Sequence, residues 1–457
     1  MKTATLVYVC SKCDAQSPKW TGQCLECGAW GTVGPAGARE AGGGRREAAA
    51  SKAAPAKVTS FADISGEGAK RTPFGIGEVD RAFGGGVVPG SVTLIGGEPG
   101  IGKSTICLLL AAKMAAAGGT VYVSGEESPA QVKARADRIG AAQQGLSFLG
   151  ETEVETVIAT LRREKPALAV IDSIQMMRSS EIPSEAGAVN QLRGVTAKLV
   201  EFAKSSGTPL LLVGHVTKDG NVAGPKTLEH LVDAVLSFEG ERTGSLRLLR
   251  VLKNRFGSTD ETGIFEMVEQ GLKEIRNPSA YLLDERHEDI SGDVVSCVME
   301  GTRPVLVDIQ ALVRKTAFGY PTRRASGIEQ SRLEMLIAVL GARGGMDLNE
   351  YDVFVNVVGG LKLKDPTTDL AFVAALASAH KGIAVRETAV WGEIGLGGEL
   401  RPVSATDRRL AEAAQLGFKR VIAPLPRKKT SMKLSNGIEV MDVHTVREAL
   451  QALTPKG

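Results

Sequence analysis

The sequence of 457 residues has few aromatic side chains and little excess charge of either sign. Phe, Trp and Tyr together make up 4% of the chain, and the formal net charge is +3. Because there is no global excess of Lys and Arg, any contact with nucleic acid must come from local basic patches. The abundant Gly and Ala residues suit both tightly packed helix–sheet layers and an unstructured connector.

Long hydrophobic runs are missing as well. No uninterrupted apolar stretch reaches the length of about 20 residues that a membrane-spanning helix needs. The apolar piece near Met1 is too short and too poorly flanked to be a secretory signal. We therefore expect a soluble, cytoplasmic protein with no membrane contact, and a chain of this length predicts two or three domains.

Cysteine is scarce, yet four of the six cysteines form two C-x-x-C pairs with ten residues between the pairs. Four thiolates in this spacing suit the tetrahedral geometry of a structural Zn²⁺ site, whereas disulfides are disfavoured in the cytoplasm. The expected ligands are Cys10, Cys13, Cys24 and Cys27. The sequence thus predicts a zinc module at residues 7–31 and, because large apolar residues are almost missing there, a flexible linker at 34–57.

The remaining cysteines and the first two tryptophans receive structural interpretations. Cys107 and Cys297 lie in apolar surroundings, so they are expected to be buried fillers. Trp20 and Trp30 are expected to pack on the zinc module, with stacking on nucleic-acid bases as the alternative.

Residues 97–104 read GEPGIGKS and fit the phosphate-binding pattern G-x-x-x-x-G-K-[ST]. They lie between a strand candidate at 91–95 and a helix candidate at 105–117, which is the context that the motif requires. A glycine-rich turn that matches by chance is the alternative. The expected nucleotide contacts are Gly97, Glu98, Pro99, Gly100, Ile101, Gly102, Lys103, Ser104 and Thr105.

After this loop, apolar runs at 121–124, 168–172 and 209–214 alternate with helical patterns, which predicts a sheet of parallel strands. Asp172 ends one of these runs, where a carboxylate can hold Mg²⁺ through water. Glu126 follows another run and is the candidate that orients or activates the attacking water, with Glu127 as substitute. Alternatively, both glutamates cap the next helix. His215 either senses the γ-phosphate or is a surface group.

The segment at 253–257 reads KNRFG and follows a strand candidate at 245–252. Lys253 and Arg255 are two residues apart, so on an extended chain they point the same way and suit a phosphate at a subunit boundary. On chemistry alone they are equally a solvated charge cluster.

With this order of motifs, the chain resembles the bacterial RadA (Sms) family of DNA-recombination and repair proteins over essentially its whole length. The resemblance implies a RecA-type ATPase at 58–280, assembled as a hexameric ring with ATP and Mg²⁺ bound between subunits. It also implies single-stranded DNA, branched recombination intermediates and the RecA recombinase as partners. By the same resemblance the catalytic residues are Lys103, Glu126, Asp172, Lys253 and Arg255, with the last two reaching a neighbour's nucleotide.

Three stretches are candidates for DNA contact. RecA-type rings present two loops to the strand, which match residues 176–193 and 217–227, with Arg178, Lys218 and Lys226 as possible phosphate contacts. A third patch combines cations with aromatic residues: Arg314, Lys315, Phe318, Tyr320, Arg323 and Arg324. Exposed surface cations and a charged connection are the alternatives.

Residues 284–457 show a second α/β pattern, in which a strand at 352–358 and a helix at 367–380 resemble the proteolytic domain of Lon. That domain uses a serine and lysine dyad. Here Thr367 falls at the serine position and Asp407 at the lysine position, and nothing recommends Lys362 or Lys364 as replacements. We therefore expect an inactive fold that contributes ring assembly and a DNA-binding surface.

The sequence thus predicts an α/β protein with a RecA-type P-loop ATPase core, a small N-terminal four-cysteine zinc module and a Lon-protease-like C-terminal domain. The predicted function is that of a DNA-dependent ATPase, a helicase-like motor that promotes branch migration in homologous recombination and DNA repair. The alternatives are an ATP-dependent Lon-like protease and a non-motor scaffold that ATP orders.

Overall fold

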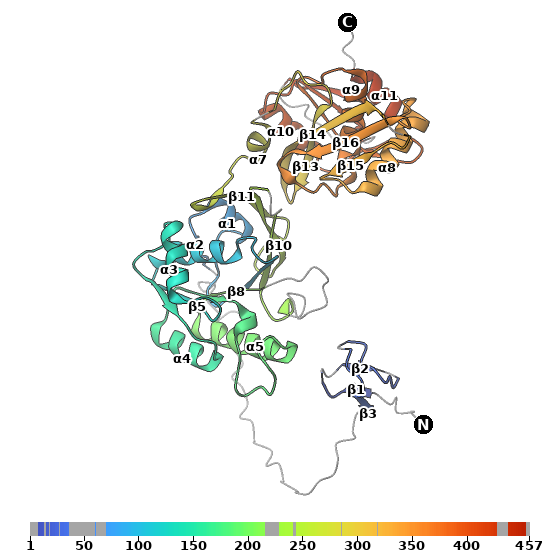
Figure 1. The fold of residues 1–457 in the computed structure, drawn as a ribbon. Helices are drawn as coiled ribbons and strands as arrows, with labels where there is room; N and C mark the ends of the chain where they lie inside the picture. Colours follow the sequence, from blue (N-terminus) through green and yellow to red (C-terminus); the bar gives the residue numbers. More distant parts are fainter. Residues whose placement is uncertain are drawn as a thin grey trace.

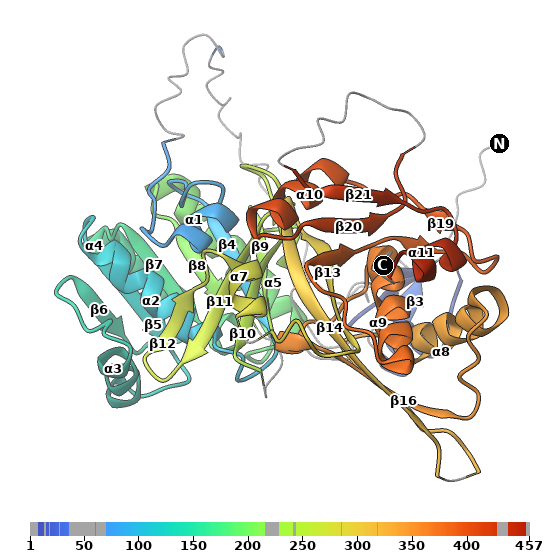
Figure 2. The same ribbon diagram turned by 90° about the horizontal axis from the view of Figure 1, so that it is seen from above.

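The computed structural model describes residues 8–12, 15–17, 19–26, 28–35, 60, 70–214, 228–240, 244–284, 286–317, 319–426 and 437–453. Its two large sheets have nine and seven strands and belong to two bodies that lie against each other (Figures 1 and 2). A separate three-stranded sheet lies near the N-terminus. None of the described helices is both long enough and apolar enough to cross a membrane.

The N-terminal sheet is small. Strand β1 (Tyr8–Cys10) pairs antiparallel with β2 (Gln16–Ser17) and with β3 (Val33–Pro35). In the described part of this sheet, the buried apolar cluster consists of Cys10, Cys24 and Val33. So small a cluster cannot stabilise a fold by burial alone, which agrees with a metal-dependent module.

The nine-stranded sheet has the order β12-β11-β10-β9-β4-β8-β7-β5-β6. The strands from β9 to β6 run parallel, as the sequence predicts, and β10 to β12 continue the sheet in antiparallel fashion. The strands are β4 (Val92–Gly97), β5 (Thr120–Ser124), β6 (Leu146–Leu149), β7 (Leu168–Asp172), β8 (Leu210–Val213), β9 (Ala234–Glu239), β10 (Leu246–Asn254), β11 (Thr262–Val268) and β12 (Gly271–Glu274).

Helices cover both faces of this sheet because successive strand residues point to opposite sides. On β4, Ile95 packs in the cluster that contains α2, while Leu94 packs in the cluster that contains α5. The first face carries α1 (Gly77–Ala82), α2 (Lys103–Ala115) and α3 (Pro129–Arg138), and the second carries α4 (Val154–Glu164) and α5 (Val189–Ser206). The carboxyl ends of the parallel strands thus form one edge, which the phosphate loop follows.

The seven-stranded sheet has the order β15-β16-β14-β13-β17-β20-β21. Its strands are β13 (Asp293–Glu300), β14 (Arg303–Lys315), β15 (Arg323–Ser326), β16 (Tyr351–Val357), β17 (Thr388–Val390), β20 (Arg420–Ala423) and β21 (Glu439–Asp442), and β18 (Glu393–Ile394) pairs apart with β19 (Leu400–Arg401). The helices are α7 (Pro278–Leu283), α8 (Gln330–Val339), α9 (Asp369–Lys381), α10 (Thr406–Gln415) and α11 (Val446–Ala452).

The two large sheets share one hydrophobic core. Leu246 and Leu248 on β10 and Ile264 on β11 lie in the same buried cluster as Val305 and Leu361 of the C-terminal sheet and its loops. Ion pairs join the same surfaces, because Arg250 lies 2.6 Å from Glu300, and Arg303 lies 3.1 Å from Glu78. Strand β10 therefore belongs to both halves of the molecule.

Several predicted elements have different bounds in the structure. The helix expected at 105–117 begins at Lys103, inside the phosphate loop, and the helix expected at 367–380 begins at Asp369 after a 3₁₀ turn, Pro366–Thr368. The loop predicted at 176–193 ends earlier, because α5 starts at Val189.

Candidate functional site

The predicted phosphate loop lies between the end of β4 and the start of α2. Gly102 is the residue before the helix and has φ 112°, and a Cβ there would lie 2.6 Å from the Met267 methyl carbon. At Gly97 a Cβ would lie 2.4 Å from the carbonyl oxygen of Phe238. Only glycine fits these two positions, so the backbone can follow the tight path that phosphate-binding loops use.

Lys103 lies inside this loop. Its Nζ donates to the carbonyl oxygens of Gly97 and Glu98, at 2.9 Å each, and the residue is only 4% exposed. Burial lowers the pKa of the Lys103 ammonium, while the charges of Asp172 and Glu126 act in the opposite direction. The structure thus brings three of the predicted site residues into one electrostatic neighbourhood.

Asp172 ends β7 beside the end of β5, where Ser124 is its pairing partner. The hydroxyl of Tyr122, also on β5, donates to Asp172 Oδ2. Burial and the adjacent Asp172 carboxylate raise the pKa of Tyr122 well above its ordinary value. Tyr122 does not stand out in the sequence because a tyrosine in an apolar strand is typical of a core, although a buried hydroxyl requires a partner.

Ser128 caps helix α3, so the alternative in which Glu126 and Glu127 are the caps is wrong. The Ser128 side chain accepts from the Gln131 backbone N–H, and the Gln131 side chain accepts from the Ser128 backbone N–H at 2.9 Å. Glu127 forms an ion pair with Arg135 on α3. Glu126 is exposed and electrostatically coupled to Lys103.

The segment Lys253 to Arg255 lies at the opposite edge of the sheet. Strand β9 places Phe238 beside Gly97 and Ala234 beside Thr93, and Asn254 of β10 pairs with Ala234. Leu248 lies at the end of β10 that is near the phosphate loop, and Asn254 lies at the other end. The six residues from Leu248 to Asn254 span about 20 Å. These cations therefore cannot reach the phosphate loop of their own chain.

Both cations make contacts within their own chain. Lys253 Nζ donates to the backbone carbonyls of Glu229 and Val232. Arg255 is 55% exposed and its Nη1 lies 3.4 Å from Asp233 Oδ1. Arg255 thus presents most of its side chain to the surface, whereas Lys253 holds the chain before β9.

Of the two loops expected to contact DNA, the structure describes the first, at 176–193, but not the second. His215, Lys218, Lys226 and the loop at 217–227 lie outside the described residues. The first loop is held by Gln191, which is 2% exposed and donates to the carbonyls of Ser179, Ile182 and Ser184. In that loop Arg178 pairs with Glu153 at 3.1 Å and stays 61% exposed.

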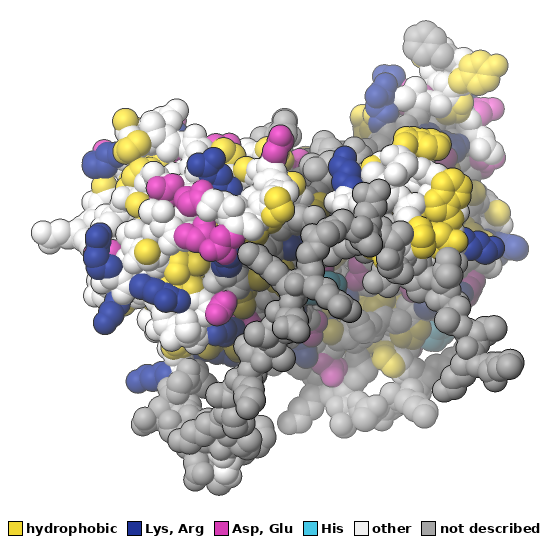
Figure 3. All heavy atoms as spheres, turned by 90° about the horizontal axis from the view of Figure 1, so that it is seen from below, with side chains coloured by type: hydrophobic (Ala, Val, Ile, Leu, Met, Phe, Trp, Pro, Cys, Tyr) yellow, Lys and Arg dark blue, Asp and Glu magenta, His cyan; other side chains and the backbone are white. Residues whose placement is uncertain are grey.

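The third patch lies at the end of the β14, β15 and β16 strands, which project from the C-terminal domain (Figure 2). Tyr320 is 91% exposed, while Arg314 lies 3.1 Å from Asp352. Lys315 and Arg324 are exposed, Arg323 is half-buried, and Phe318 lies outside the described residues. Figure 3 shows basic and acidic side chains interspersed over one face of the molecule, as the small net charge implies.

Two of the four predicted metal ligands are described, and their surroundings fit a thiolate site. Cys10 and Cys24 are buried together, and the backbone N–H of Lys12 donates to Cys10 Sγ at 3.4 Å. Cys13 and Cys27 lie outside the described residues. Trp20 and Trp30 lie against the module as expected, because Trp20 Nε1 donates to the Val33 carbonyl at 2.9 Å and both rings lie beside Gly22, although they stay 62% and 75% exposed.

The Lon-like site has no dyad among the described contacts. The Thr367 hydroxyl donates to Asp365 Oδ1 at 2.6 Å, and Asp407 lies in the first turn of α10. Arg409, also on α10, is fully buried and donates to the carbonyl of Ser404 at 3.0 Å. Thr367 therefore bonds to a carboxylate, and no amine that could deprotonate its hydroxyl occupies the lysine position.

Cys107 and Cys297 are fully buried, as expected of fillers. Burial raises the pKa of the Cys107 thiol well above its ordinary value and that of Cys297 to about 12. Neither thiol is therefore a reactive thiolate near neutral pH.

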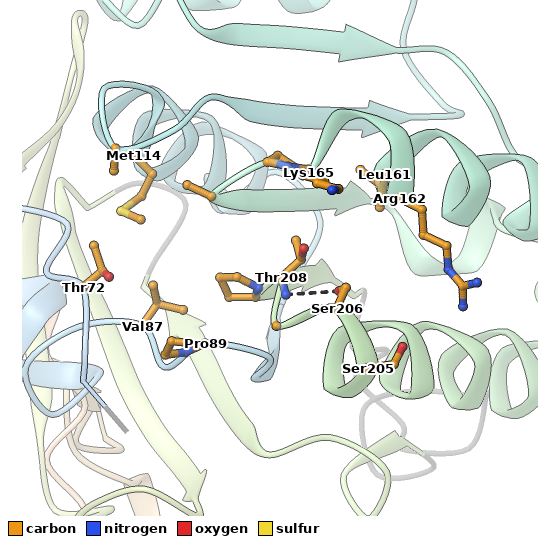
Figure 4. A pocket seen from close by; sticks show the side chains of 15 residues that line it. Thr72, Val87, Pro89, Met114, Leu161, Arg162, Lys165, Ser205, Ser206 and Thr208 are labelled. Atoms are coloured by element: carbon orange, nitrogen blue, oxygen red, sulfur yellow. Dashed lines mark hydrogen bonds between the residues drawn. The ribbon is translucent and has the colours of Figure 1, made fainter. Parts of the chain in front are cut away.

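A cavity of about 800 Å³ lies at the edge where the parallel strands begin, away from the phosphate loop (Figure 4). Pro89, Ala167 and Pro209, which precede three of these strands, line it together with residues near the ends of α2, α4 and α5. A second cavity of about 590 Å³ lies between the phosphate loop and residues 359–365 of the C-terminal domain.

Comparison with known proteins assigns the three parts of the chain. Residues 76–221 match an AAA domain, residues 8–35 a rubredoxin metal binding domain, and residues 341–455 the C-terminal proteolytic domain of Lon protease (S16). These matches confirm the predicted fold class.

Relatives named DNA repair protein RadA match nearly the whole chain. The protein from Pseudomonas aeruginosa is 46% identical over 99% of this chain and 100% of its own length. The proteins from Bacillus subtilis and Escherichia coli are 46% and 44% identical, over 97% and 98% of both chains. The chain, with its ATPase domain and metal-binding module, therefore belongs to the family of the DNA repair protein RadA.

Proposed function

We propose that this chain is a DNA-dependent ATPase, a helicase-like motor on single-stranded DNA that promotes branch migration of recombination intermediates. The observation that carries the proposal is the separation of Lys103 and Arg255 on opposite edges of one sheet. A cation that cannot reach its own nucleotide but is 55% exposed fits a role at the nucleotide of a neighbouring copy.

Such a site implies a particular kind of assembly. When the Arg255 edge of one copy meets the phosphate loop of the next, the interface is head-to-tail, and repeated contacts of this kind form a ring when the rotation between subunits closes. The family resemblance gives this ring six subunits. Hydrolysis then depends on assembly, which links turnover to the movement of one subunit against the next.

Within one site the described residues divide the chemistry. We infer that the loop at 97–104, with Lys103 and Ser104, binds the phosphates, and that Glu126 orients the attacking water and accepts its proton. Asp172, whose carboxylate accepts from the Tyr122 hydroxyl, would hold Mg²⁺. The carboxylate next to the loop and the Ser104 hydroxyl suit this ion, which supplies neutralisation of phosphate charge when bound.

The metal-binding module is proposed to hold Zn²⁺ through Cys10, Cys13, Cys24 and Cys27. The buried pair and the N–H bond to sulfur support thiolate ligands, and four protein ligands leave no open position for catalysis. The role of the metal is therefore structural.

The proposed DNA contacts come from Arg178, from the loop at 217–227 and from the projecting end of β14 and β15. Cations that are exposed on surfaces of mixed charge give phosphate contacts without a global field. Branched recombination intermediates and the RecA recombinase are the proposed partners.

Proteolysis is the rival activity, and the bond from Thr367 to Asp365 argues against it. A casein-cleavage assay with ATP and DNA present is expected to stay blank. Cleavage that disappears in Thr367→Ala would instead establish a peptidase.

The decisive experiment measures the ATPase rate with and without single-stranded DNA, beside particle mass. We expect DNA to stimulate turnover of a multi-subunit particle, and Lys103→Ala to abolish both turnover and branch migration. If Lys103→Ala retains full branch migration, the chain is a scaffold that ATP orders and the motor is wrong.

A further inference from the structure

Arg247 occupies an unusual position on strand β10. It is a charged residue between two leucines, and it is only 5% exposed. Strand residues alternate between faces, so Arg247 points to one side of β10, and Leu246 and Leu248 point to the other. The leucines belong to the core shared with the C-terminal domain, whereas Leu249, on the same side as Arg247, lies in the ATPase core.

On its own side, Arg247 reaches the phosphate loop. Its Nε donates to the carbonyl oxygen of Ile101 at 3.1 Å, and its Nη1 donates to the carbonyls of Gly244 and Leu246 at 2.6 and 2.8 Å. Gly240 leaves room for the side chain, because a Cβ there would lie 2.7 Å from Arg247 Cδ. A buried guanidinium is costly unless it is bonded, so these contacts fix the position of Ile101.

On the other side of β10, the C-terminal domain packs closely. A Cβ at Gly359 would lie 3.2 Å from Leu246 Cδ1, and Leu361 is buried in the same cluster as both leucines. Across the cavity of about 590 Å³, Gly97 and Ile101 face the segment that carries Leu361. A cavity separates the phosphate loop from residues 359–363 at this point. The packed contact between these two segments therefore runs through β10.

We propose that Arg247 is a positioning residue for the phosphate loop, and that through β10 it links nucleotide binding to the packing of residues 359–363 of the C-terminal domain. The proposal concerns the ATPase activity itself and does not depend on DNA or branch migration. Nucleotide affinity is then set partly by packing in the C-terminal domain.

The test uses the full chain with Arg247→Met, which keeps length but removes the donors, and Arg247→Lys, which keeps the charge. We expect Arg247→Met to raise the KM for ATP about tenfold, as loss of a charged hydrogen bond implies, with a smaller change in kcat. Arg247→Lys restores part of the affinity. Arg409→Met, on α10 and away from β10, removes a fully buried arginine that donates to the carbonyl of Ser404, and it is the control that lowers thermal stability without changing KM.

A second pair of variants tests the link from the C-terminal side. Leu361→Ala and Leu410→Ala both remove a buried leucine from the C-terminal domain, but Leu410 lies in the other core cluster with Trp391. We expect both to lower the melting temperature and only Leu361→Ala to raise KM. An unchanged KM in Arg247→Met overturns the positioning role, and equal KM values for the leucine pair overturn the link. If Arg247→Met fails to fold, the leucine pair decides.

Discussion

At the scale of single residues, the candidate site depends on side chains that hold other side chains. Tyr122 on Asp172, Arg135 on Glu127, Gln191 on the loop at 176–184 and Arg247 on Ile101 are all buried or half-buried partners. None carries the chemistry itself. Each of them holds in place a group that is proposed to bind nucleotide, metal or DNA or to take part in catalysis. Removing such a partner affects activity nearly as strongly as removing the group that it holds.

Tyr122→Phe is expected to weaken the use of Mg²⁺. The variant loses the hydroxyl that donates to Asp172, and a hydrogen bond to a charged group contributes about 1.5–3 kcal/mol. We expect kcat to fall roughly tenfold or more and the Mg²⁺ concentration for half-maximal ATPase rate to rise. A Mg²⁺ titration of the ATPase rate measures this, with Tyr351→Phe in the C-terminal domain as the matched control. Identical titration curves for Tyr122→Phe and the unsubstituted protein would contradict the role.

A buried pair of carboxylates in the C-terminal domain gives a pH-dependent effect on stability. Asp293 and Asp308, on β13 and β14, are 3% and 2% exposed. Burial, followed by the charge of Asp293, raises the pKa of Asp308 from 3.8 to about 7. Arg286 donates to Asp293 at 2.7 Å and Gln310 donates to Asp308 at 3.1 Å. The folded protein therefore holds a proton on Asp308 that the unfolded chain releases.

Because the folded-state pKa lies above the unfolded value, stability falls as the pH rises from 3.8 towards about 7. Asp308→Asn cannot ionise, so we expect its melting temperature to exceed that of the unsubstituted protein at pH 8.5, with the gap narrowing by pH 5. Thermal unfolding followed by circular dichroism at both pH values measures the gap. Asp289→Asn, at a carboxylate that is 80% exposed, is the control. A gap that is constant with pH would show that the pair does not share a proton in this way.

At the scale of elements, the three-stranded sheet of β1, β2 and β3 is expected to depend on its metal. A strong zinc chelator should unfold residues 10–27 while the ATPase domain keeps its melting transition, because the module has almost no apolar core. Hydrogen exchange read by mass spectrometry separates the two regions. Loss of protection throughout the ATPase sheet on chelation would contradict an independent module.

Local pattern was enough to predict most elements but not their neighbours. The strand at Leu168–Asp172 and the parallel sheet follow from apolar runs between helical patterns. The hydrogen bond from Tyr122 to Asp172 could not be predicted in this way, because it requires β5 to lie beside β7 and joins residues that are 50 positions apart. A lone Arg247 between leucines is a signal in the sequence, but its target, Ile101, comes from a different part of the chain.

At the scale of the whole molecule, Arg255→Ala is expected to leave ATP binding nearly intact and to collapse DNA-stimulated turnover. The expectation follows from the distance between Arg255 and its own phosphate loop. Binding of a fluorescent ATP analogue and the steady-state ATPase rate separate the two effects. Loss of ATP binding together with turnover would instead show that Arg255 stabilises its own subunit.

Mixing two inactive variants tests the shared site directly. Lys103→Ala copies keep Arg255, and Arg255→Ala copies keep Lys103, so some interfaces in a mixed assembly are complete. At equal amounts and random mixing, about a quarter of the interfaces are complete, and the ATPase rate should recover to about that fraction. Mixed particles of full mass that show no recovery would contradict a site built from two subunits.

The shared strand β10 also governs how the molecule can be divided. The two large family matches stop at residue 221 and resume at residue 341, and β10, β13 and β14 lie in the stretch between them. A fragment that lacks the C-terminal domain would expose Leu246, Leu248 and Ile264 to water. Such an exposed apolar surface promotes aggregation. The ATPase and C-terminal parts therefore depend on each other for burial of this core. A chimera with a relative, or a purified fragment, should keep the two parts together.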